Sequence, residues 1–217
     1  MPWNWQSPDW PNFRLQTSEL VALESHFLRL SGVFEGCIAH IDDQDRRRIA
    51  VEIISEEAHQ TSEIEGEILN RESLQASLRC HFGLETDRRK IPPAEAGIAE
   101  MMVDLYQHYD RPLTHDRLFE WHRSLCSGRR DLHAVGRYRT GGDAMQVVSG
   151  PIHEPKIHFE APPAAAMPAE MDAFLDWFAR IAPSVSSPLP ILTRAGIAHL
   201  YFVTIHPFVD GNGRIAR

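Results

Sequence analysis

The 217-residue sequence has few cysteines, no excess of basic charge and no long apolar run. Its three cysteines are scattered and odd in number, which argues against a disulfide framework and fits a reducing compartment. The formal net charge is -8, so bulk attraction to nucleic acid is not expected. No apolar run approaches the roughly 20 residues that cross a bilayer, and the first residues show no signal-peptide pattern. These absences predict a cytoplasmic protein without a nucleic-acid or membrane partner.

Apolar residues make up 43% of the sequence, which is enough to bury a core. The length suits one large domain, or a core with a small additional module. Residues 1–14 hold three tryptophans and read as an extended arm that packs on the fold. Pro92 and Pro93 separate the first group of helical patterns from the next. We therefore predict an N-terminal helical module over residues 1–91 and a core unit over residues 92–217.

Apolar residues at helical spacing, such as Leu30 and Phe34 in the first pattern, predict a series of helices. The last pattern, residues 191–205, is apolar on nearly all sides and predicts a central buried helix. Residues 146–148 and 156–159 read as the two strands of a β-hairpin. The predicted fold class is all-α with one small hairpin. The helices are expected over about residues 18–41, 43–65, 71–81, 94–109, 114–127, 168–181 and 191–205.

Chemically useful side chains gather in the last twelve residues, 206–217. His206 follows the predicted buried helix, so its position should be rigid, and a neutral imidazole can accept a proton from an attacking hydroxyl. Asp210 supplies a hard oxygen ligand that suits Mg²⁺ bridging phosphate oxygens. A hairpin turn at residues 212–213 is the alternative. A hairpin needs a strand on each side, however, and a helical pattern precedes this turn.

The same stretch offers groups that suit a polyphosphate. Gly211 and Gly213 let the backbone approach phosphate closely, and Asn212 adds an amide donor. Arg214 and Arg217 are three residues apart on the expected helix, so both point to one side and can bind phosphate oxygens. The stretch therefore predicts a site that binds a nucleotide polyphosphate and activates a hydroxyl.

The twelve residues match the signature of the Fic family, His-x-Phe-x-Asp/Glu-Gly-Asn-Gly-Arg-x-x-Arg, at every fixed position. The resemblance covers nearly the whole chain. It implies a Fic-type helical bundle with a β-hairpin flap beside the active site. The family mostly transfers AMP from ATP to a Ser, Thr or Tyr hydroxyl of a target protein. By this resemblance His206 is the catalytic base, Asp210 the ligand for Mg²⁺, and residues 211–217 the phosphate cradle.

The expected partners are a target protein, the chain itself by automodification, and a second copy in a homodimer. An exposed strand edge can take up an extended peptide as an added strand. The target segment is therefore expected to dock along the hairpin near Val147, Val148 and Ile157. Residues 136–139 resemble the segment that leads into the flap of Fic proteins.

Residues 61–66 resemble the inhibitory motif of the same family, which reads Ser/Thr-x-x-x-Glu-Gly/Asn. Thr61 and Glu65 lie one helical turn apart, and Gly66 is expected to end the helix. A Glu65 carboxylate paired with Arg217 would occupy the group that should hold the γ-phosphate. The resemblance therefore implies an autoinhibited enzyme.

Two other interpretations stay open. One is a helical interaction module without catalysis. The other is a Fic enzyme of different chemistry, either phosphotransfer or removal of AMP assisted by Glu65. Fic cores usually continue beyond the motif, and one helical turn is too short to be stable alone. The sequence is therefore expected to be the N-terminal part of a longer protein, and less active and less stable than an extended form.

Overall fold

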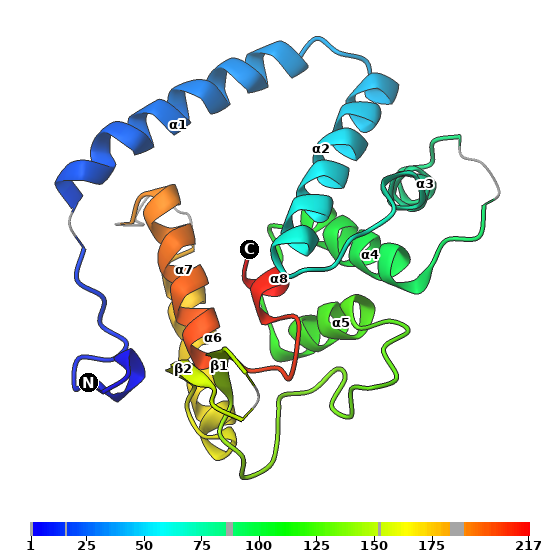
Figure 1. Ribbon diagram of the computed structural model, residues 1–217. Coiled ribbons are helices and arrows are strands. Elements are labelled where there is room, and N and C mark those ends of the chain that lie inside the picture. Colours follow the sequence, from blue (N-terminus) through cyan, green and yellow to red (C-terminus); the bar gives the residue numbers. More distant parts are fainter. Residues whose placement is uncertain (1, 16, 86–88, 152, 183–188) are drawn as a thin grey trace.

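The computed structural model describes residues 2–15, 17–85, 89–151, 153–182 and 189–217 (Figure 1). It is a helical bundle with a two-stranded hairpin, so the predicted fold class is confirmed. The helices are α1 (Thr17–Ile38), α2 (Asp43–Ile64), α3 (Arg71–His81), α4 (Pro93–Gln107), α5 (His115–Leu125), α6 (Met167–Arg180), α7 (Ile191–Ile205) and α8 (Asn212–Ala216). Strands β1 (Gln146–Ser149) and β2 (Lys156–Glu160) and the 3₁₀ turns η1 (Asn4–Gln6) and η2 (Ala164–Ala166) complete the described elements.

Local capping explains where several helices begin. The Asp42 side chain accepts a hydrogen bond from the Asp45 N–H at 2.9 Å and caps α2. Thr114 caps α5 in the same way, accepting from the Arg117 N–H at 3.2 Å. Pro93 is the first residue of α4, where its missing N–H costs nothing. The observed helix ends differ from the predicted ends by at most three residues.

The core lies where α2, α3, α4 and α5 pack together, and it continues into the packing of α6, α7 and α8. Its fully buried side chains include Leu74 of α3, Tyr201 of α7 and Phe208 of the loop between α7 and α8. The short helix α8 touches α2, α5 and α7. Figure 1 shows α8 near the centre of the molecule, just below the end of α2. This packing brings the end of α2 against the last residues of the chain.

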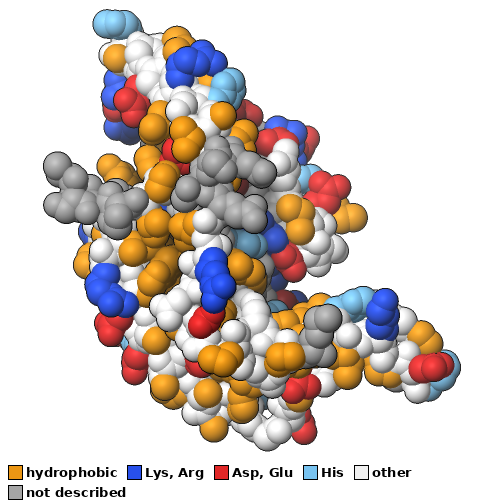
Figure 2. Space-filling model, turned by 90° about the vertical axis from the view of Figure 1, so that its left-hand side faces the viewer, with side chains coloured by type: hydrophobic (Ala, Val, Ile, Leu, Met, Phe, Trp, Pro, Cys, Tyr) orange, Lys and Arg blue, Asp and Glu red, His pale blue; other side chains and the backbone are white. Residues whose placement is uncertain are grey.

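Helices α1 and α7 expose more apolar side chains than their sequence patterns predict. In α1, Leu30 and Phe34 are each 47% exposed, and Figure 1 shows this helix crossing above the body of the molecule. Hydrophobic side chains lie at the surface on the side that Figure 2 presents. In α7, Tyr201 is buried but Leu200 is 47% exposed, so the expectation of a helix buried all round is wrong. Periodicity identified both helices but not how many of their faces are covered.

The N-terminal arm lies on α7 and on the hairpin. The Trp5 indole N–H donates to the Glu160 carbonyl at 2.6 Å, and the Asn4 amide donates to the Thr204 hydroxyl at 2.9 Å. These contacts confirm that the arm packs on the fold. They also fix the end of β2 to the last turn of α7.

The hairpin is antiparallel, with Val147 opposite Phe159 and Val148 opposite Ile157. A bulge lies between Val147 and Val148. The side chains of Val147, Val148 and Ile157 are all exposed. The hairpin therefore presents apolar side chains and strand edges to the surroundings.

All three cysteines are free thiols, and of these Cys126 is buried. Across the described ranges, no helix combines the length and the apolar character that a bilayer crossing requires.

Candidate active site

His206 lies directly after α7, where the chain leaves the helix. Its φ of 52° makes it the one non-glycine residue with a positive φ in the described part of the chain. Burial lowers the pKa of the His206 imidazole because it penalises the charged form. The Val203 carbonyl opposes this shift, whereas the positive charge of Arg139 adds to it. The imidazole is therefore neutral near pH 7, as a general base must be.

The loop after His206 is held from within by Asn212. The Asn212 side-chain oxygen accepts from the Phe208 N–H at 2.9 Å, and its amide donates to the Phe208 carbonyl at 2.8 Å. The Phe208 ring is fully buried and stacks on His122, with ring centroids 4.2 Å apart. The structure thus uses the Asn212 amide to shape the loop, and its predicted contact with phosphate stays a prediction.

Two glycines let the loop pack closely. Gly211 has a φ of 79°, and a Cβ there would come within 2.8 Å of the Leu125 side chain. A Cβ at Gly213 would overlap the Glu65 carboxylate. The missing side chain at Gly213 therefore lets a carboxylate approach the backbone where the sequence predicts phosphate.

Asp210, the predicted metal ligand, is held by its neighbours. One of its oxygens accepts from the Gly211 N–H at 2.6 Å, and the other pairs with Arg129 at 2.8 Å. In the residues that the structure describes, no cluster of three or more His, Cys, Asp or Glu side chains could hold a metal ion. One carboxylate nevertheless fits Mg²⁺ when phosphate oxygens and water complete the coordination, as is common beside nucleotides.

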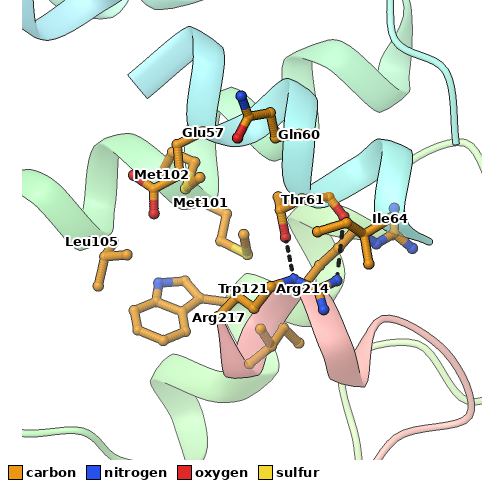
Figure 3. Close-up of a pocket in the computed structure, with 11 residues that line it drawn as sticks. Glu57, Gln60, Thr61, Ile64, Met101, Met102, Leu105, Trp121, Arg214 and Arg217 are labelled. Carbon is orange, nitrogen blue, oxygen red and sulfur yellow. Dashed lines mark hydrogen bonds between the residues drawn. The ribbon is translucent and has the colours of Figure 1, made fainter. Parts of the chain in front are cut away.

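Arg217, the second arginine of the motif, faces the end of α2. Its Nε donates to the Thr61 hydroxyl at 2.8 Å, and an Nη donates to the Thr61 carbonyl at 3.3 Å (Figure 3). The same Nη forms an ion pair with Glu65. Gly66, with a φ of 78°, ends α2 at this point. The structure therefore brings Thr61, Glu65 and Arg217 together, and the inhibitory role of this contact stays a prediction.

Arg214, the first arginine of the motif, has a second acidic partner. Its side chain is only 6% exposed and forms an ion pair with Glu67. Glu67 follows the turn at Gly66, and its N–H donates to the Ser62 carbonyl at 2.9 Å. Sequence reasoning did not select Glu67, because its partner is 147 residues away and a lone glutamate carries no spacing signal.

A small cavity of about 170 Å³ lies beside the two arginines. Figure 3 shows Met101, Met102 and Trp121 on its apolar side and Thr61 of α2 hydrogen-bonded to Arg217. At this cavity the end of α2 meets the last residues of the chain through the polar contacts of Thr61 with Arg217. A contact of that kind can be exchanged for phosphate without breaking a packed apolar core.

The hairpin stem adjoins His206 through a buried arginine. The Arg139 guanidinium donates to the His206 carbonyl at 2.8 Å and also to the carbonyl of Pro162, two residues beyond β2. Val147 and Ile157 lie further out on the same hairpin and are exposed. Their role in docking a target stays a prediction.

Sequence reasoning missed three charged residues at the motif: Arg129, Glu67 and Arg139. Each reaches the motif loop from a distant segment, and none belongs to a spaced pattern. The one available signal was that Arg139 lies in residues 136–139, which resemble the segment leading into the flap.

The helical fold and the hairpin are those that the resemblance to Fic proteins implies. Residues 112–217 match the model of the Fic/DOC family, and residues 3–84 match that of a domain of unknown function, DUF4172. A "Protein adenylyltransferase Fic" from Nematostella vectensis is 35% identical over 106 residues, which cover 48% of this chain and 21% of that protein. Residues 112–217 therefore form a Fic domain.

Solved structures of Fic proteins share the fold. A Fic family protein from Desulfovibrio desulfuricans G20 has 24% identity and a TM-score of 0.57, over 95% of this chain and 56% of that one. A Fic domain containing signaling protein from Bacteroides thetaiotaomicron has 25% identity and a TM-score of 0.55, over 83% and 66%. Fic-1 from C. elegans has 23% identity and a TM-score of 0.60, over 92% and 56%. The chain thus spans about a fifth of the curated relative and 56–66% of these structures.

Proposed function

We propose that this chain transfers AMP from ATP to a Ser, Thr or Tyr hydroxyl of a target protein. The observation that supports this most is that one short segment, residues 206–217, carries a neutral His206, the Asp210 carboxylate and the two arginines Arg214 and Arg217. Such a transfer needs a base for the hydroxyl and cations for the leaving phosphates. The relative with 35% identity carries the name protein adenylyltransferase, which supports the same reaction.

In the proposed reaction His206 accepts the proton of the target hydroxyl. The hydroxyl oxygen bonds to the α-phosphorus of ATP, the bond from that phosphorus to the bridging oxygen breaks, and pyrophosphate leaves. Arg214 and Arg217 bind oxygens of the leaving phosphates. Gly211 and Gly213 give those phosphates access to backbone N–H groups.

Mg²⁺ fits this site as an ion that arrives with the nucleotide. Asp210 is the residue that would hold it, since Mg²⁺ is commonly bound by one or two carboxylates together with substrate phosphates. When bound, the ion neutralises phosphate charge. Arg129 pairs with the same carboxylate at 2.8 Å, so it holds Asp210 in place.

Autoinhibition by Glu65 is part of the proposal. The carboxylate occupies Arg217, and the Thr61 hydroxyl orients the same guanidinium. ATP phosphates and this carboxylate compete for one cation, so activity is low while Glu65 is in place. Exposed Val147, Val148 and Ile157 support docking of the target segment along the hairpin edge.

The test uses the full chain with Glu65→Gly to remove the competing carboxylate. The protein is incubated with Mg²⁺, ATP labelled at the α-phosphate, and cell lysate. Mass spectrometry of labelled targets, and of the chain itself for automodification, should show added AMP. His206→Ala should lower the rate on the order of 10²–10⁴-fold or more.

Other outcomes identify the alternatives. Added phosphate in place of AMP would mean phosphotransfer, and loss of AMP from a premodified target would mean removal. Undiminished transfer by His206→Ala would refute the assignment of the base. Failure of both the wild-type chain and Glu65→Gly to bind ATP would favour a helical interaction module. A homodimer and a cytoplasmic location remain part of the proposal, and light scattering and cell fractionation test them.

A further inference from the structure

Arg139 is a buried cation that bonds to the backbone. It is 4% exposed, and across the described ranges it pairs with no carboxylate. Its Nε donates to the His206 carbonyl at 2.8 Å, and an Nη donates to the carbonyls of Ile205, at 3.4 Å, and of Pro162. Its own N–H donates to the Pro207 carbonyl at 2.9 Å. Burying a charge costs free energy, so the hydrogen bonds of this guanidinium must offset the loss of its hydration.

These bonds satisfy carbonyls that the end of α7 leaves without helical partners. They also hold the peptide groups around His206, including the carbonyl of His206 itself. His206 adopts a left-handed conformation that a side chain other than glycine takes rarely, so the surrounding contacts must impose it. Because the backbone sets the direction of the Cα–Cβ bond, contacts that hold this backbone also restrict where the His206 imidazole can point.

The same guanidinium bonds to Pro162, which follows β2. One side chain therefore connects the stem of the hairpin with the residue that carries the base. The segment that is proposed to hold the target and the group that is proposed to take its proton are held in fixed relation.

Arg139 also acts on His206 through its charge. Burial is the largest cause of the lowered pKa of the His206 imidazole, and the positive charge of Arg139 works in the same direction. The Val203 carbonyl and the charges of Glu65 and Asp210 work in the opposite direction. Removing the charge of Arg139 should therefore raise the pKa of His206.

We propose that Arg139 is a positioning residue, which fixes the orientation of His206 and joins it to the hairpin flap. The role of His206 as base rests on the proposed function. The effect of Arg139 on the pKa of His206 does not depend on the proposed function, because it can be measured without any turnover.

The test compares Arg139→Gln, which removes the charge, with Arg139→Lys, which keeps the charge but cannot bond several carbonyls in one plane. NMR of histidines labelled at Cε1 gives the pKa of His206, whose signal is the one absent from His206→Asn. Arg139→Gln should raise this pKa, and Arg139→Lys should leave it near the wild-type value. In the Glu65→Gly background both should lower kcat about 10- to 100-fold, since small misplacements of catalytic groups cost that much.

Arg117→Gln is the matched control. Arg117 is also a shielded guanidinium that bonds carbonyls at a helix end, those of Asp104 and His108 at 3.2 and 2.8 Å. Its substitution should lower stability without changing the pKa of His206.

An unchanged His206 pKa in folded Arg139→Gln would overturn the proposal. So would a wild-type kcat in Arg139→Lys, which carries the test if Arg139→Gln does not fold. A rise in the His206 pKa in a chain that transfers no AMP would sink the proposed function but support the role of Arg139.

Discussion

The Glu67 carboxylate forms an ion pair with the Arg214 guanidinium, which is only 6% exposed. Asp210 lies 3.8 Å from the same guanidinium. A shielded arginine between two carboxylates is neutralised before any phosphate arrives. Because Glu65 pairs with Arg217, both arginines of the motif have an acidic partner from the segment around the end of α2.

Replacing Glu65 by glycine should raise AMP transfer about 10- to 100-fold. The lost contact is charge-assisted and is worth roughly 1.5–3 kcal/mol, and each 1.4 kcal/mol is about tenfold in population. Automodification with labelled ATP measures the rate. Glu63→Gly is the matched control, since Glu63 is an exposed residue near the same helix end. Equal activation by Glu63→Gly, or no activation by folded Glu65→Gly, would contradict autoinhibition by Glu65.

Adding Glu67→Gln to Glu65→Gly should tighten ATP binding by a further factor of about ten. The neutral amide no longer competes with phosphate for the Arg214 guanidinium. Calorimetry on variants that also carry His206→Ala, which prevents turnover, gives the Kd for ATP. Glu56→Gln is the control, because Glu56 pairs at 2.9 Å with Arg71, outside the motif. An identical Kd with and without Glu67→Gln would mean that this ion pair does not oppose nucleotide binding.

Proline at Val147 should lower transfer to target proteins at least about tenfold and leave ATP binding unchanged. Proline removes a backbone N–H that strand pairing needs. Labelling of lysate proteins measures the transfer, and calorimetry measures ATP binding. Val147→Thr keeps the N–H and the branched side chain, so it should behave like the wild type. If folded Val147→Pro modifies targets at the wild-type rate, the target docks elsewhere.

Stability should fall as the pH drops from about 6.5 towards 4, because His122 is buried in its neutral form. Its Nδ1 accepts from the Gly136 N–H at 2.9 Å, and burial lowers the pKa of His122 from 6.5 to about 4. Between these values the unfolded chain binds the proton more readily, so stability is complete above pH 6.5 and is lost on acidification. The full loss is roughly 3 kcal/mol, since one pKa unit is worth about 1.4 kcal/mol.

Urea unfolding at a series of pH values measures this loss. His122→Gln should flatten the dependence, whereas His81→Gln, at an exposed histidine, should not. A dependence that is unchanged in His122→Gln would assign the acid sensitivity to other groups.

The sequence predicted the helices well because their signals are local. The caps Asp42 and Thr114, and the proline at position 93, act within one turn of the helix ends they define. The burial of a helix face is harder to predict, because it depends on which other segments pack against the helix. Leu30 of α1 and Leu200 of α7 keep an apolar spacing but remain exposed.

Site residues that belong to a spaced sequence pattern were likewise easier to predict than those that do not. Thr61 and Glu65 were found because two residues at a fixed spacing resemble a known pattern. Glu67 and Arg139 contact residues that lie 147 and 67 positions away in the sequence. No sequence pattern marks Glu67, and residues 136–139 mark Arg139 only as part of the segment that leads into the flap. The contacts of both residues with the motif are therefore visible only in the folded chain.

The order of the elements along the chain affects how the site first forms. During synthesis the ribosome releases α2 and the turn at Gly66 well before it releases residues 206–217. N-terminal segments generally begin to fold first. Glu65 and Glu67 are then already in reach when Arg214 and Arg217 emerge, so the two ion pairs can form as soon as the chain is released. If Glu65 inhibits transfer as proposed, a newly made molecule is inhibited from the moment it folds, and activation would be a later event that acts on a folded molecule.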